Sequence, residues 1–107
     1  MYLYIELDDD YSEEEMIKLD MMYDDLNKFL KTNFLQEYVA LYLRCLYKYD
    51  FLGEKTTDLV RHINSAIDTF NNVKYNDVNF RKVKQILKQK YNLIIVKEEP
   101  YLELKEI

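Results

Sequence analysis

Apolar residues recur at steps of three and four over much of this chain, which is the pattern of helices that bury one face. The first such segment covers residues 13–31. Ser12 precedes it and Glu15 follows three positions later, a spacing that predicts a capping box at the helix start. Its apolar stripe is expected to face a core and comprises Met16, Leu19, Met22, Tyr23, Leu26, Phe29 and Leu30.

The second segment, residues 33–50, is apolar almost all round, with Asn33 as its predicted cap. Such a helix is central to its domain, or else a partner covers its second face. Gly53 then provides a left-handed cap or a tight turn. A third helix is expected to begin at a cap formed by Thr56 or Thr57, and to bury Leu59, Ile63, Ala66, Ile67 and Phe70.

The last third of the chain predicts one more helix and a hairpin. A loop is predicted by Asn71, Asn72, Lys74, Tyr75 and Asn76. Asp77 is then placed to cap a helix that ends near Tyr91 and Asn92. Residues 93–96 and 101–105 flank KEEP, where Pro100 suits the loop of a β-hairpin. Residues 2–7, YLYIEL, predict an opening strand that would add a third strand to the sheet.

These elements make a mostly helical α+β fold, with about four helices and a short antiparallel sheet. One glycine and one proline in 107 residues are too few for a many-turned all-β fold. The length suits one domain over residues 1–107, and 49% hydrophobic residues are enough for a globular core.

Several function classes are disfavoured by residues that the chain lacks. Cys45 and His62 are its only cysteine and histidine, so an internal disulfide and a multi-cysteine zinc site are excluded. Neither lies in a nucleophile motif, and Cys45 sits in the most apolar helix, where burial should raise its pKa. Asp8, Asp10 and Ser12 have the spacing of a calcium loop, but Glu13 and Leu19 stand where that loop needs glycine and glutamate. We therefore expect no enzyme activity, cofactor or metal.

The first residues and the lack of a long apolar run predict a soluble cytoplasmic protein without a membrane segment. The first ten residues hold no basic stretch before an apolar one, so they do not resemble a secretory signal. No run approaches the roughly 18 apolar residues of a membrane span.

Charge is divided unevenly along the chain, whose net charge is −5. Residues 1–54 carry a net charge of minus eight, and residues 55–107 carry plus three. A dense negative field speeds encounter with a basic surface such as that of a nuclease or another nucleic-acid-binding protein. The acidic surface predicted to bind such a partner consists of Asp8, Asp9, Asp10, Glu13, Glu14, Asp20, Asp24 and Asp25, with Tyr11 as an aromatic anchor.

The basic fourth helix gives an alternative. Lysine and arginine neutralise phosphates, and glutamine can pair with an adenine edge. Helices followed by a terminal hairpin resemble winged-helix DNA-binding domains over residues 55–107, with the hairpin as the wing. The resemblance implies a nucleic-acid surface of Arg81, Lys84, Gln85, Lys88 and Lys90. The chain departs from that family in its acidic hairpin, which carries Glu98, Glu99, Glu103 and Glu106, and in the long connection before the helix.

Three functional hypotheses follow. The first is a small acidic protein that binds and blocks a basic macromolecule, in the manner of bacterial immunity proteins and phage anti-defence proteins. Eleven tyrosines support this idea, because aromatic residues exceed what such a core is expected to hide and some should anchor a contact surface. The second is the DNA-binding module, and the third is an assembly subunit that self-associates through the apolar second helix.

Overall fold

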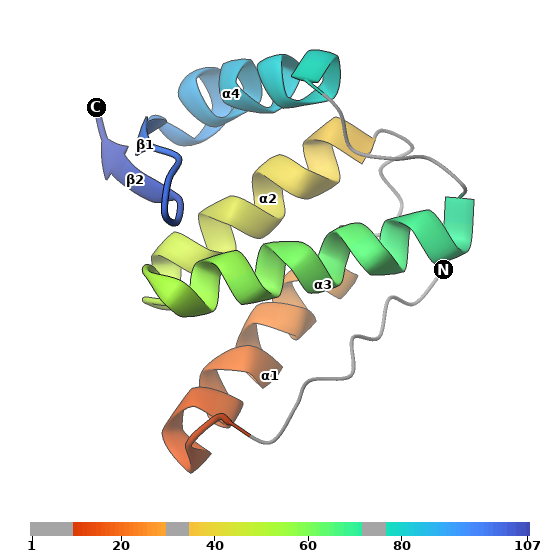
Figure 1. Cartoon of the computed structure of the whole chain (residues 1–107), viewed down its shortest axis with the longest axis vertical. Helices are drawn as coiled ribbons and strands as arrows, with labels where there is room; N and C mark the ends of the chain where they lie inside the picture. Colours follow the sequence, from red (N-terminus) through yellow and green to blue (C-terminus); the bar gives the residue numbers. More distant parts are fainter. Residues whose placement is uncertain (1–9, 30–34, 72–76) are drawn as a thin grey trace.

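The computed structural model describes residues 10–29, 35–71 and 77–107, in which four helices precede one antiparallel hairpin (Figure 1). The elements are α1 (Glu13–Asn27), α2 (Leu35–Lys48), α3 (Glu54–Asn71), α4 (Asp77–Tyr91), β1 (Leu93–Lys97) and β2 (Glu103–Glu106). This confirms the mostly helical α+β prediction. The strand predicted over residues 2–7 lies outside the described residues, and the sheet within them has two strands.

α2 is the central helix, with α1 and α4 packed on opposite sides of it and α3 alongside (Figure 1). Every residue from Val39 to Leu43 is buried, so the helix is covered all round within this part of the chain. The prediction that this apolar helix is central to its domain is therefore confirmed. Its neighbours complete one core with Leu19, Met22 and Leu26 of α1, Leu59 and Ile63 of α3, and Val83 and Leu87 of α4.

α1 buries a narrower stripe than its sequence predicts. Leu19, Met22 and Leu26 are buried, but Met16, which was expected to join them, is 45% exposed. With 3.6 residues per turn, Met16 lies about 90° around the helix from the centre of that stripe. Phe29 is 48% exposed because the helix ends at Asn27, before the predicted residue 31. Leu30 lies outside the described residues.

The turn between α2 and α3 differs from the prediction in its cap. Asp50 and Gly53 both have left-handed backbones, with φ of 64° and 97°, and they reverse the chain within a few residues. α3 therefore begins at Glu54, and Thr56 and Thr57 lie inside its first turn instead of capping it. Gly53 takes the cap position, where its carbonyl accepts the N–H of Thr56 at 3.0 Å. The tight turn expected at Gly53 is confirmed.

α4 ends at Tyr91, as the sequence predicts, and begins at Asp77, the residue that was expected to cap it. Asn92, with φ of 55°, ends it and leads directly into β1. The hairpin pairs Ile94 with Lys105 and Ile95 with Leu104, with an irregularity between Ile95 and Lys97. Leu93 and Leu104 are buried on one face of the sheet. The second strand starts at Glu103 and not at residue 101, because residues 98–102 form the connection.

Candidate functional site

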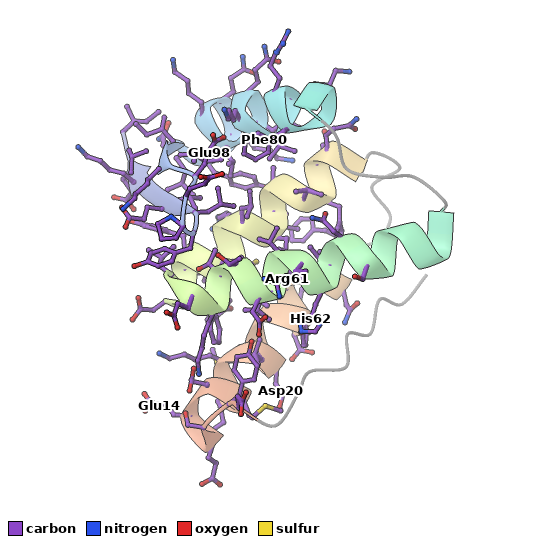
Figure 2. All side chains as sticks on the ribbon, in the orientation of Figure 1. Glu14, Asp20, Arg61, His62, Phe80 and Glu98 are labelled. Atoms are coloured by element: carbon purple, nitrogen blue, oxygen red, sulfur yellow. The ribbon has the colours of Figure 1, made fainter. Side chains whose placement is uncertain are left out.

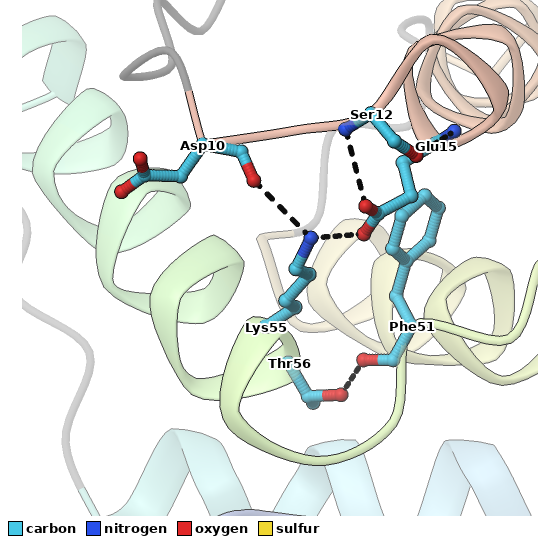
Figure 3. Close-up of polar contacts among 6 residues, drawn as sticks. All are labelled: Asp10, Ser12, Glu15, Phe51, Lys55 and Thr56. Atoms are coloured by element: carbon cyan, nitrogen blue, oxygen red, sulfur yellow. Dashed lines mark hydrogen bonds and ion pairs between the residues drawn. The ribbon is translucent and has the colours of Figure 1, made fainter.

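The start of α1 is attached to α3, a helix that begins about forty residues later. Ser12 and Glu15 form the predicted capping box, in which each side chain accepts the backbone N–H of the other. The ammonium of Lys55 on α3 pairs with the Glu15 carboxylate and donates to the Asp10 carbonyl at 3.4 Å (Figure 3). It also lies over the Tyr11 ring, 4.6 Å from the centroid. Glu15 therefore serves the fold and is not available to a partner.

The hydrogen bond from Lys55 is the main reason that the pKa of Glu15 falls to about 2. Because the folded pKa lies below the unfolded value, this carboxylate adds stability above about pH 5, and that stability is lost as pH falls toward 2. We expect Lys55→Met to return the pKa of Glu15 toward its usual value near 4.5. An NMR titration of the Glu15 side-chain carboxyl carbon, in the variant and in the unsubstituted chain, measures this change. An unchanged Glu15 midpoint would contradict the Lys55 contact.

Asp25, predicted to face a partner, is held by α2 instead. Its Oδ2 accepts hydrogen bonds from Tyr49 Oη at 2.6 Å and from Lys48 Nζ at 2.9 Å. These two bonds, that from Tyr49 first, lower the pKa of Asp25. The network joins the end of α1 to the end of α2. Asp25 therefore fixes the position of α1 and is separated from the other acidic side chains of that helix.

The remaining acidic residues of α1 share its solvent face. No described cation lies within ion-pair distance of Glu13, Glu14, Asp20 or Asp24, and all four are exposed. Figure 2 shows Glu14 and Asp20 at the end of the molecule opposite Phe80 and Glu98. Asp10 is exposed just before the helix, while Asp8 and Asp9 lie outside the described residues.

Two apolar side chains that sequence reasoning missed stand among these carboxylates. Ile17 is 58% exposed and Met21 is 50% exposed. They are four residues apart, so they are neighbours on one side of the helix. We call the combined surface the α1 outer face; it comprises Glu13, Glu14, Ile17, Asp20, Met21 and Asp24. The sequence could have shown this, because helical spacing places Ile17 and Met21 on the side opposite the stripe of Leu19, Met22 and Leu26.

The described tyrosines do not supply exposed anchors. Tyr11 is half-buried and packs against the core, and its pKa rises to about 12, first because of burial and then because of the nearby carboxylates of Asp58, Glu15 and Asp10. Tyr47 and Tyr101 are also half-buried. The exposed large apolar side chains among the described residues are instead mostly aliphatic or methionine, with Phe29 as the one aromatic. Tyr2, Tyr4 and Tyr75 lie outside the described residues.

The basic residues of α4 divide into two groups. The side of α4 away from the core exposes Arg81, Lys82, Gln85 and Lys88. No described carboxylate pairs with the three cations Arg81, Lys82 and Lys88. Lys84 differs, because its Nζ pairs with Glu98 of the hairpin connection at 3.2 Å and lies over the Phe80 ring. Lys90 lies over the ring of Tyr91. The predicted basic surface is thus partly neutralised at the hairpin.

Other parts of the described structure offer weaker sites. An open pocket of about 240 Å³ lies between α3 and the hairpin connection, lined by Glu54, Thr57, Arg61, Pro100 and Tyr101. Its opposite charges favour neither an anion nor a cation. His62 is half-buried, and burial raises the pKa of the Cys45 thiol to about 11, as predicted. In residues 10–29, 35–71 and 77–107 no cluster of three metal-ligating side chains is placed to hold an ion.

Two further findings bear on the class of protein. No helix in the described part of the chain combines the length and the apolar character needed to cross a membrane. No protein-family model, curated protein or solved structure matches the chain. Functional inference therefore depends on the surfaces themselves.

Proposed function

We propose that this protein acts by binding, without catalysis, a basic protein partner through the α1 outer face. The observation that carries the proposal is the mixture on that face: four carboxylates without described ion-pair partners surround the exposed Ile17 and Met21. Exposed carboxylates alone are expected on a solvated helix. Adjacent apolar side chains add contact area that becomes favourable only when a partner covers it.

The chemistry of this face indicates the class of partner. Its carboxylates would repel phosphates, so a nucleic acid is disfavoured there. A protein surface that binds nucleic acids presents the opposite charge, and blocking such a surface is how an immunity or anti-defence inhibitor would act. Rigid attachment supports this role, because Lys55 and the Asp25 network hold both ends of α1 in place before binding.

A matched pair of triple variants tests the proposal. Glu14→Gln, Asp20→Asn and Asp24→Asn remove three charges from the α1 outer face. Glu98→Gln, Glu99→Gln and Glu106→Gln remove the same number from the hairpin region. Captured basic proteins are identified from a native lysate by quantitative mass spectrometry, and the affinity of each is then measured with the purified partner. Only the α1 variant should lose affinity, by about tenfold or more, because complementary charge worth about 1.4 kcal/mol or more is removed.

The apolar part of the face needs its own variant. Ile17→Ser with Met21→Ser should lower the affinity for the same partner. The salt dependence of binding should stay unchanged, because no charge is altered. The α1 charge variant should reduce that salt dependence. Equal losses from the α1 and hairpin charge variants would overturn the proposal, since net charge alone would then explain binding.

A second candidate is nucleic-acid binding by α4, favoured by the unpaired cations Arg81, Lys82 and Lys88 on one exposed side. The hairpin follows α4 directly, in the order of a winged helix, but its Glu98 already forms an ion pair with Lys84. Fluorescence anisotropy of a labelled random duplex distinguishes the two candidates. Binding that weakens steeply with salt, and is lost with Arg81→Glu and Lys88→Glu, would support α4.

A further inference from the structure

Within residues 10–29, 35–71 and 77–107, no strand pairs with the outer edge of β2. In the described residues β2 pairs with β1 alone, and in Figure 1 β2 lies at the left margin, beyond the ends of α2, α3 and α4. The N–H of Ile107 donates to the Asn92 carbonyl at 2.9 Å, which continues the hairpin ladder beyond β2. Backbone groups alternate in direction along a strand, so those of Leu104 and Glu106 point away from β1. Such an edge can accept another strand.

The outer face of the same hairpin carries exposed apolar side chains beside Glu103 and Lys105. Ile94, Val96 and Ile107 are exposed there, and Ile107 is 68% accessible. Two strands make a small sheet, whose stability increases when more strands join it. A partner strand along β2 would extend both the backbone ladder and this face.

We infer that two copies of this chain pair antiparallel along β2 and form one four-stranded sheet. The sequence of the strand selects the partner and the register. A two-fold axis can pass through any of the four residues of β2. An axis at Glu103 or Glu106 sets a glutamate opposite itself, and an axis at Lys105 does the same with a lysine, so all three place like charges in direct opposition.

The axis at Leu104 avoids this repulsion. It sets Glu103 of each copy opposite Lys105 of the other, which gives two ion pairs across the join. Leu104 then faces Leu104 of the second copy, and the outward backbone groups of both residues can exchange hydrogen bonds. Glu103 and Lys105 fall in the pairs between those bonds, where opposing Cα atoms are only about 4.5 Å apart. Charge and backbone geometry therefore favour the same register.

The choice of edge also limits the size of the assembly. Pairing of β2 with itself uses the same edge in both copies, so the assembly closes at a dimer. The interface is short, and association is expected to depend on concentration. This surface is separate from the α1 outer face, so the two proposals can fail independently.

Sedimentation equilibrium over a range of concentrations tests the inference. It compares the unsubstituted chain with two charge variants and one proline variant. The unsubstituted chain should show a monomer–dimer equilibrium. Glu103→Lys and Lys105→Glu should each raise the dissociation constant about tenfold, since each places like charges opposite one another twice. An equimolar mixture of these two variants should recover the dimer, because the mixed pair again opposes unlike charges.

Glu106→Pro is the backbone control. The N–H of Glu106 points away from β1, so proline there should leave the hairpin folded and remove a bond of the join. Circular dichroism checks that each chain is folded. The inference is overturned if the unsubstituted chain stays monomeric at millimolar concentration, if the proline variant dimerises as well as the unsubstituted chain, or if mixing does not restore association. The α1 triple variant should dimerise normally.

Discussion

Tyr42→Ala is expected to cost about 3–5 kcal/mol of folding stability, a large part of the 5–15 kcal/mol typical of a small domain. The Tyr42 side chain is fully buried in the middle of α2. Its hydroxyl donates to the Leu59 carbonyl of α3 at 2.9 Å, so the residue fills the core and also joins two helices. Chemical unfolding in urea, followed by circular dichroism, measures the loss.

Tyr42→Phe separates the two contributions. It keeps the ring and removes the hydrogen bond, for which we expect a cost of only about 0.5–1.5 kcal/mol. The Leu59 carbonyl lies within α3 and can still accept a bond of that helix. If the phenylalanine variant were as unstable as the alanine variant, the hydroxyl and not the packing of the ring would dominate.

Thr56→Val is expected to cost about 1–3 kcal/mol, although the two side chains have nearly the same shape. Thr56 is fully buried, and its Oγ1 donates to the carbonyl of Phe51, itself a buried residue (Figure 3). Valine would leave that carbonyl without its side-chain donor at the tight turn between α2 and α3. Thermal unfolding measures the change, and a variant as stable as the unsubstituted chain would contradict the role of this bond.

The neighbouring threonine provides the matched control. Thr57 Oγ1 is also buried, but it has no hydrogen-bond partner in the described structure. Thr57→Val removes a polar group whose burial is uncompensated, so we expect a neutral or slightly stabilising effect. The same substitution at two adjacent positions should thus have different effects.

Local signals in the sequence predicted most of the fold. The Ser12 and Glu15 capping box, the turn at Gly53, and the end of α4 at Asn92 each depend on residues close in the chain, and all three are observed. Thr56 was misplaced because both a helix cap and a first-turn position suit threonine. Thr56 lies inside the first turn because the left-handed residues Asp50 and Gly53 reverse the chain early, so that α3 begins at Glu54.

The candidate site was predicted less completely, since its composition depends on contacts between distant residues. Glu15 and Asp25 look like their acidic neighbours in sequence, yet Lys55 and the Lys48 and Tyr49 pair bind them from other helices. Periodicity assigned Met16 to the core because it follows three- and four-residue steps. The width of the buried stripe is fixed by how closely α2 approaches α1, which no local pattern contains.

The separation of α1 from α4 across the fold gives the molecule a polarity in its electric field. Glu14 and Asp20 of the α1 outer face lie at one end of the molecule, and α4, which carries Arg81, Lys82 and Lys88, lies at the other (Figures 1 and 2). Near a positively charged surface this arrangement produces a torque that turns α1 forward and α4 back. The torque acts within roughly one Debye length, about 8 Å at physiological salt, before any side chains touch. Orientation would therefore be selected during approach, and fewer collisions would be wasted.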